Sequence, residues 1–149
     1  MPVTISQVRG SIAVGGLAAF LLACSSPTGP TSLRSILAHR ALWNEQKLTS
    51  YSFTYQFSAF NGLANQPLRM EVRQDTVRSV VVVATGDTVT PTHFPTIDVL
   101  FDRALRAAEN GSLTRISFDT RRGYPTIVGY EAIPDLLSSE QASAVEPLP

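Results

Sequence analysis

The sequence predicts an α+β domain in which two helices pack on one face of an antiparallel sheet of four to six strands. Aromatic and polar residues alternate from Tyr51 to Phe57, which is typical of a strand with one buried face. Apolar residues recur at helical spacing from Ile97 to Ala108, which is typical of an amphipathic helix. The segments follow one another as helix, three strands, helix and two or three strands, and such helices need a sheet face to cover.

The first 23 residues are typical of a bacterial lipoprotein signal peptide. One basic residue, Arg9, precedes an apolar stretch from Ser11 to Phe20, and Ala23-Cys24 follows shortly after it. A basic start, an apolar segment and a small residue before the cleavage point direct export. A cysteine directly after that small residue indicates attachment of fatty acyl groups such as palmitate. Cys24 is the only cysteine of the chain, so we expect it to carry lipid rather than to form an internal disulfide.

Cleavage before Cys24 divides the chain into a signal peptide over 1–23, a flexible tether over 24–31 and a single domain over 32–149. After the cysteine, the tether contains only serine, threonine, proline and glycine, so we expect the domain to lie close to the membrane. Ser25 follows the cysteine where aspartate would favour retention in the inner membrane. We therefore expect a cell-envelope protein, anchored in the outer membrane and facing the periplasm if the organism has one.

The charge balance argues against nucleic acid as a partner. The chain has twelve basic and twelve acidic residues, and loss of the signal peptide removes only Arg9. Proteins that bind nucleic acid usually carry a clear excess of positive charge.

We expect the first helix from Ser32 to about Leu48, with Ser32 or Thr31 as its N-cap and Trp43 as its anchor on the sheet. Its stripe at roughly helical spacing consists of Leu33, Ile36, Leu37, Arg40, Ala41 and Trp43. The first strand, Tyr51–Phe57, then presents its aromatic side chains to one face. An aromatic stripe also suits a sugar-binding platform, but because the helices need a face to cover, we assign it to the core.

The next two strands are predicted as a hairpin, Leu68–Arg73 and Thr76–Ala84, joined by a two-residue turn at Gln74-Asp75. This register places Val72 opposite Val77 and Glu71 opposite Arg78. It also places Val80 and Val82 on the outer face of the sheet, where we expect something to cover them. The cover is either the C-terminal segment or a partner protein or membrane surface.

The second helix is predicted to follow a loop containing Pro91, His93 and Pro95, with Thr96 as N-cap and Asn110-Gly111 at its end. Its apolar stripe consists of Ile97, Leu100, Phe101, Ala104, Leu105 and Ala108. Asp98 and Asp102 lie one turn apart on the polar face. We attribute them to the helix dipole and to pairing of Asp102 with Arg106 rather than to catalysis.

Two further strands, Leu113–Asp119 and Thr126–Glu131, are joined by a loop over 120–125 in which Gly123 supplies the turn. Arg121 and Arg122 lie at its tip, where they either solubilise the protein or bind anionic lipid or a partner. Residues Ser143–Leu148 are a candidate last strand.

These segments resemble one family of small bacterial secreted proteins, domain-of-unknown-function family 6174. The resemblance rests on the lipobox, which is the signal-peptide motif that ends at Ala23-Cys24, and on Leu42-Trp43, the Tyr51–Phe57 strand, Phe94–Phe101, Phe118-Asp119 and Gly123–Thr126. It would cover nearly the whole chain after the signal peptide. It implies no activity, cofactor or site residue.

No catalytic, cofactor or metal motif is evident. No serine lies in a G-x-S-x-G turn, the setting of a hydrolase nucleophile. Neither His39 nor His93 has a cysteine or carboxylate at zinc-ligand spacing. We therefore expect no enzymatic activity, and His93 is the one histidine that merits a test.

Two functional hypotheses remain. The leading one is a lipid-anchored module that binds another envelope protein through the surface formed by Val80, Val82, Arg121, Arg122 and Tyr124. The alternative is a carrier that holds a small apolar ligand between the sheet and the helices.

Overall fold

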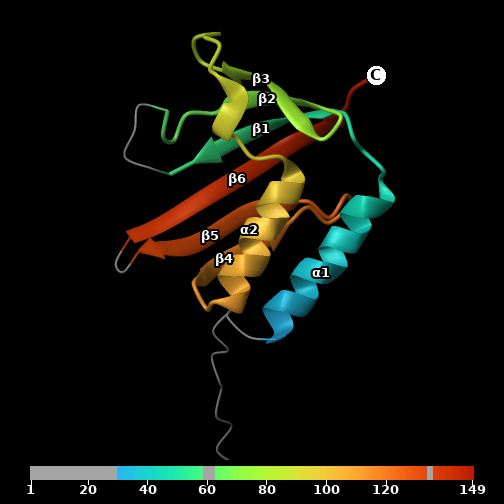
Figure 1. Cartoon of the computed structure of the whole chain (residues 1–149), viewed down its shortest axis with the longest axis vertical. Coiled ribbons are helices and arrows are strands. Elements are labelled where there is room, and N and C mark those ends of the chain that lie inside the picture. Colours follow the sequence, from blue (N-terminus) through green and yellow to red (C-terminus); the bar gives the residue numbers. More distant parts are fainter. Residues whose placement is uncertain (1–29, 59–62, 134–135) are drawn as a thin grey trace, which may run out of the picture.

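The protein has an α+β fold with a six-stranded antiparallel sheet and two helices on one of its faces (Figure 1). The computed structural model describes residues 30–58, 63–133 and 136–149. A short 3-10 helix before the second helix is an element that the predicted order lacked. In chain order the elements are α1 (Pro30–Glu45), β1 (Tyr51–Phe57), β2 (Leu68–Arg73), β3 (Thr76–Val82), η1 (Pro91–His93), α2 (Ile97–Glu109), β4 (Leu113–Phe118), β5 (Pro125–Ile133) and β6 (Leu136–Pro147).

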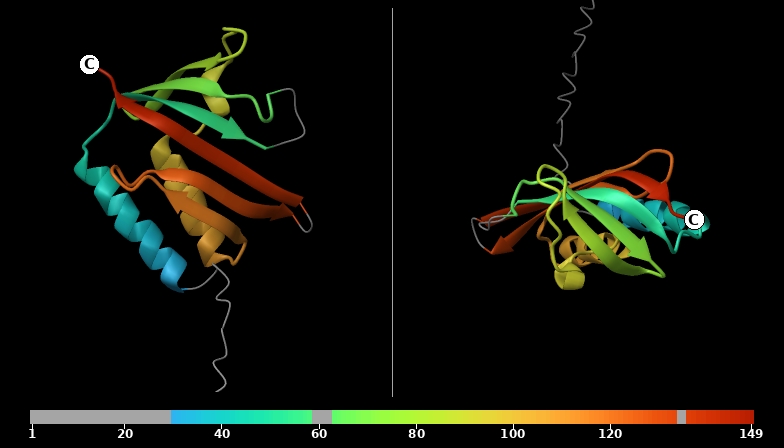
Figure 2. Two further views of the ribbon diagram at one scale, coloured as in Figure 1. Left: turned by 180° about the vertical axis from the view of Figure 1, so that it is seen from behind. Right: turned by 90° about the horizontal axis from the view of Figure 1, so that it is seen from above.

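The C-terminal strand β6 lies in the middle of the sheet. The strand order is β3-β2-β1-β6-β5-β4, so β6 joins two three-stranded meanders by pairing with β1 on one side and β5 on the other. The predicted last strand, 143–148, is therefore only the end of a longer one. Because β6 lies within the sheet, it does not cover the outer face, and Figure 2 shows that face from behind with no helix over it.

The β2–β3 hairpin has the predicted turn but a different register beyond it. Gln74 and Asp75 both have positive φ, at 50° and 56°, as a two-residue hairpin turn requires. Val72 pairs with Val77 as predicted, but Glu71 pairs with Ser79 and not with Arg78. The ladder shifts at this point, which places one extra residue on β3.

This bulge reverses which valines face the core. A one-residue slip sends every later side chain to the opposite face of a sheet. Val80 and Val82 are therefore buried, with exposed fractions of 0% and 4%, whereas Val83 is 56% exposed. The prediction that Val80 and Val82 lie on the outer face is wrong.

The aromatic face of β1 forms the centre of the core, as the alternation predicts. Tyr51, Phe53 and Tyr55 are all nearly inaccessible to solvent. They belong to one apolar cluster with the sheet-facing side of α2, whose buried residues are Ile97, Leu100, Phe101, Ala104 and Ala107.

The N-cap predicted for α2 is confirmed. The Thr96 hydroxyl accepts a hydrogen bond from the Val99 N–H at 3.3 Å, and the Ile97 N–H donates to the Tyr51 hydroxyl at 3.0 Å. Both bonds satisfy first-turn N–H groups that have no partner within the helix. The start of α2 is thereby fixed to the strand β1.

Helix α1 begins at Pro30, so Ser32 lies inside the helix and is not its N-cap as predicted. Proline is well accommodated in a first helical turn. Trp43 anchors the helix as expected, because it is buried and meets the Tyr51 ring edge-on at a centroid distance of 5.3 Å. Leu37, by contrast, is 55% exposed.

The loop between β4 and β5 supports α1 through Gly123. This glycine has φ +82°, and a Cβ there would lie 2.6 Å from the His39 carbonyl oxygen and 2.9 Å from the Leu42 Cβ. Only glycine satisfies both the left-handed backbone and this close approach. The loop is therefore a packed support for α1.

We expect Gly123→Ala to lower the free energy of unfolding by about 1 to 3 kcal/mol more than Gly86→Ala, because overpacking costs about that much. Gly86 also has positive φ, at +77°, but a Cβ there would meet nothing within 4 Å. The control variant therefore includes only the cost of placing alanine at positive φ and no steric clash. Urea denaturation of the two variants measures the difference, and equal losses would show that α1 does not rest on Gly123.

Candidate functional site

A cavity lies between the inner face of the sheet and the layer formed by η1 and α2. Its volume is about 550 Å³. It is lined by Tyr55, Phe57, Ser58, Leu63, Val89, Thr90, His93, Phe94, Pro95, Arg103, Tyr130, Ser138, Ser139 and Glu140. These residues come from β1, β5, β6, η1 and α2, and from segments joining them.

The wall of this cavity carries a buried carboxylate, Glu140 of β6. In the sheet register Tyr55 lies opposite Ala142, and Tyr130 lies opposite Ser138. Both tyrosines are therefore diagonal neighbours of Glu140 on the inner face, within reach of long side chains. The Tyr55 hydroxyl donates to the Oε1 of Glu140 at 2.5 Å, and the Tyr130 hydroxyl donates to its Oε2 at 3.4 Å.

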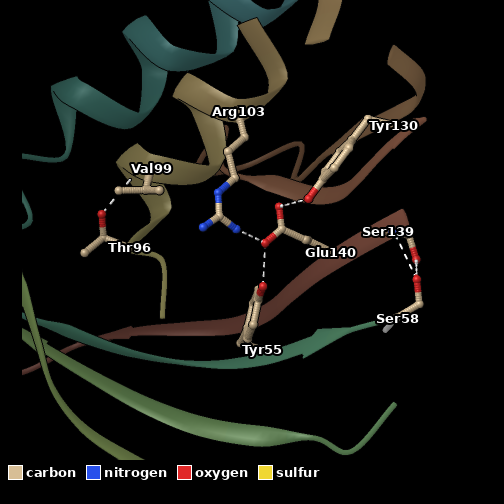
Figure 3. Close-up of polar contacts among 8 residues, drawn as sticks. All are labelled: Tyr55, Ser58, Thr96, Val99, Arg103, Tyr130, Ser139 and Glu140. Atoms are coloured by element: carbon tan, nitrogen blue, oxygen red, sulfur yellow. Dashed lines mark hydrogen bonds and ion pairs between the residues drawn. The ribbon is translucent and has the colours of Figure 1, made fainter. Parts of the chain in front are cut away.

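Arg103 of α2 supplies the opposite charge. It lies three residues after Leu100 and four before Ala107, both of which are buried, so it projects from the sheet-facing side of the helix. Its Nη1 donates to the Oε1 of Glu140 in an ion pair. The Glu140 side chain is 4% exposed and that of Arg103 is 31% exposed. Figure 3 shows Arg103 and the two tyrosines converging on the carboxylate.

Burial keeps the hydroxyl groups of Tyr55 and Tyr130 protonated, so that they can donate hydrogen bonds. Desolvation, followed by the negative charge of Glu140, raises the pKa of Tyr55 far above its ordinary value of 10.0. The same two effects raise the pKa of Tyr130. Each phenol therefore stays protonated at neutral pH and can hydrogen-bond to the carboxylate.

Aromatic rings form the apolar part of the cavity wall. Phe94 meets the rings of Tyr55 and Phe57 edge-on, at centroid distances of 6.3 and 6.4 Å. Leu63 and Val89 extend this apolar surface. Ser58 and Ser139 also line the cavity, with their hydroxyl oxygens 3.4 Å apart. The cavity thus combines an aromatic wall, hydroxyl groups and one pair of opposite charges.

Comparison with known proteins identifies the family. The profile of a family of unknown function, DUF6174, matches residues 35–145. The chain belongs to DUF6174. This confirms the resemblance seen in the sequence, and the matched range contains all the described residues that line the cavity. No curated protein and no solved structure matches the chain.

Three of the five residues predicted to form an interaction surface are buried in this DUF6174 protein. Val80 and Val82 face the core because of the β3 bulge. Tyr124 is 6% exposed and packs edge-on against Trp43 at a centroid distance of 6.3 Å. Its burial follows from the packing of α1 on the β4–β5 loop. These three residues do not form a docking surface.

Arg121 and Arg122 lie in that same loop. Asp119 holds their backbone, since its Oδ1 accepts hydrogen bonds from the Arg121 N–H at 3.0 Å and the Arg122 N–H at 2.6 Å. Arg121 is exposed and Arg122 is half-buried. The two arginines are thus accessible to solvent, whereas Val80 and Val82, which were predicted to share a surface with them, are buried.

The two histidines lie apart. His39 stacks on Phe118 at a centroid distance of 4.0 Å, and its Nδ1 lies 2.9 Å from the Ser35 carbonyl oxygen, so it packs α1 against the sheet. His93 is exposed and lies at the rim of the cavity. Within the described residues, no group of three or more His, Cys, Asp or Glu side chains is placed to hold a metal ion.

The two helix carboxylates tie α2 to α1. Asp102 pairs with Arg40 of α1 at 2.8 Å, and not with Arg106 as predicted. Asp98 accepts a hydrogen bond from the Trp43 Nε1 at 3.4 Å.

In the described part of the chain, no helix is long and apolar enough to cross a membrane. Cys24 and the signal peptide, 1–23, lie outside the described residues.

Sequence reasoning missed Glu140 and Arg103. Glu140 lies in a segment to which no strand was assigned, so its face could not be predicted. Arg103 did carry a signal, because its spacing from Leu100 places a charge on the buried side of α2. A charged residue on an apolar helix face calls for a partner of opposite charge.

We expect stability to fall above about pH 10 because Tyr51 and Tyr55 are buried. Both have pKa values raised above the 10.0 of an unfolded chain. Above that pH the unfolded state binds fewer protons than the folded state, so the free energy of unfolding drops by about 1.4 kcal/mol per pH unit for each phenol. Tyr55→Phe should make this fall shallower in urea denaturations from about pH 8 to about pH 11.

Phe53→Leu is the matched control, because it changes a buried ring that carries no phenol. It should lower stability equally at every pH. If the free energy of unfolding of the wild type fell with pH no more steeply than that of Tyr55→Phe, the placement of the Tyr55 hydroxyl would be contradicted.

Proposed function

We propose that this DUF6174 protein is a lipid-anchored protein of the bacterial cell envelope that binds a small ligand between its sheet and its second helix. The observation that carries the proposal is the cavity of about 550 Å³ with the Glu140–Arg103 pair in its wall. Ligand pockets commonly have about 300 to 1,000 Å³, with apolar walls and a few polar groups that fix orientation. The aromatic wall and the charged pair match that description.

The charged pair supports a binding role because stability gives little reason for it. Apolar residues of similar volume often stabilise a protein as well as a buried ion pair does, or better. Glu140 is nonetheless held by Arg103, Tyr55 and Tyr130, which come from three different elements. Such a network fixes polar groups in one arrangement, as recognition of a ligand requires.

Ligand binding is favoured over the protein-binding hypothesis. Burial of Val80, Val82 and Tyr124 leaves only Arg121 and Arg122 of the surface on which that hypothesis rested. Binding is also favoured over catalysis, because the Oε1 of Glu140 already accepts hydrogen bonds from Tyr55 and Arg103, which suits a fixed binding group more than a base.

The proposed location rests on the lipobox. Acyl groups on Cys24 would hold the domain close to the membrane through the tether over 24–31, and Ser25 favours the outer membrane. Two or more acyl chains suffice for stable anchoring. The ligand would then be one that the domain meets in the periplasm.

We expect compounds that co-purify with the full chain from the bacterial envelope to be lost from Thr90→Trp. An indole at Thr90, which lines the cavity, displaces a drug-sized ligand, so retention should fall at least about fivefold. Mass spectrometry of the denatured protein measures the compounds released.

Thr88→Trp is the matched control. Thr88 is an exposed threonine of the same loop and is not among the cavity-lining residues. It should retain the compounds at the wild-type level. Equal retention by both variants would place the compounds elsewhere and overturn the proposal.

Cys24→Ser should abolish labelling of the protein by radioactive palmitate in growing bacteria and shift it out of the membrane fraction. Cys24 is the only cysteine of the chain, so no other thiol can accept the label. Labelling of the serine variant at the wild-type level would refute the lipid anchor.

A further inference from the structure

We propose that the ligand of this cavity is an uncharged amphiphile whose polar end both donates and accepts hydrogen bonds, as a sugar headgroup does. This inference rests on the proposed function and adds the chemical class of the ligand. It follows from the charges and hydrogen-bonding groups that line the cavity.

The charges of the cavity wall cancel. Arg103 and Glu140 are the only arginine, lysine, aspartate or glutamate residues among the described lining residues, and they are paired with each other. An anionic ligand that reaches Arg103 would also approach the Glu140 carboxylate, and a cationic ligand that reaches Glu140 would approach Arg103. Both arrangements place like charges together beside Glu140, whose side chain is 4% exposed, and this is costly. A neutral polar end avoids this cost.

The pair still offers both kinds of hydrogen bond. Arginine has five N–H donors, and Glu140 engages Arg103 through Nη1. In Figure 3 the other terminal nitrogen points away from the carboxylate. Among the described residues, the hydrogen bond to the Oε2 of Glu140 is a long one, 3.4 Å, from Tyr130. A hydroxyl group can donate to that oxygen and accept from arginine, and a sugar carries several such hydroxyls.

The remainder of the wall suits the apolar part of such a ligand. The rings of Tyr55, Phe57 and Phe94 lie within 6.4 Å of one another by centroid, and Leu63 and Val89 lie beside them. The hydroxyls of Ser58 and Ser139, 3.4 Å apart, also line the cavity. Apolar and hydrogen-bonding groups thus line one cavity, as an amphiphile requires.

The test compares three probes that share an eight-carbon chain: octyl glucoside, octanoate and octylammonium. Each is titrated into the full chain by calorimetry, below its micelle concentration and near pH 8, where histidine is largely uncharged. We expect octyl glucoside to bind at least about tenfold more tightly than either ion, a factor that one unfavourable charge contact readily supplies.

The result also distinguishes this inference from the proposed function. Tighter binding of octanoate or octylammonium would overturn the uncharged class but would leave a ligand cavity in place. Failure of all three probes to bind would also overturn the assignment to uncharged amphiphiles. The proposed function would then be tested by the comparison of compounds that co-purify with Thr90→Trp and with Thr88→Trp.

Charge variants sharpen the test. Glu140→Gln leaves Arg103 without its countercharge and should shift the preference toward octanoate by at least about tenfold. Arg103→Gln should shift it toward octylammonium in the same way. The double variant Arg103→Gln/Glu140→Gln restores neutrality and should again favour octyl glucoside, which keeps the test decisive if one single variant fails to fold.

Asp102→Asn is the matched control. It removes one negative charge from α2, but Asp102 pairs with Arg40 outside the cavity. Its preference among the three probes should equal that of the wild type. An unchanged preference in Glu140→Gln, or a shift in Asp102→Asn as large as in Glu140→Gln, would overturn the inference.

Discussion

The contact between Glu140 and Arg103 links a central strand of the sheet to the helix packed on it. Glu140 lies on β6, the strand that joins the two meanders, and Arg103 lies on α2, the helix that crosses between them. Removal of one partner from a buried ion pair costs about 3 to 5 kcal/mol, because the other charge is left unpaired. Both partners must therefore stay in place once they are buried together, and the pair sets the polar end of the cavity.

Much of this architecture could be predicted from residue patterns. The alternation in β1 identified the buried aromatic face, and Thr96 marked the start of α2. The bulge in β3 could not be predicted, because the run from Val80 to Val83 is apolar in either register. A similar irregularity lies near Ala144, whose φ is 52°. Tertiary packing decides the face of such strands.

The candidate site was less accessible to sequence reasoning. The hypothesis of a ligand between sheet and helices, drawn from the sequence, identified the region of the cavity. It did not identify Glu140 or Arg103. Their pairing joins residues 37 positions apart, and it depends on the central position of β6. Tyr55 was predicted correctly as a core residue, yet its hydroxyl becomes informative only once a buried carboxylate lies beside it.

A crystal structure of the full chain purified from the bacterial envelope would test most directly whether the cavity holds a ligand. We expect electron density for a small molecule in the cavity, with hydrogen bonds to Arg103 or Glu140 and apolar contacts to Phe94. Density for water alone beside an intact Glu140–Arg103 pair, or a side chain of the protein filling the cavity, would contradict it.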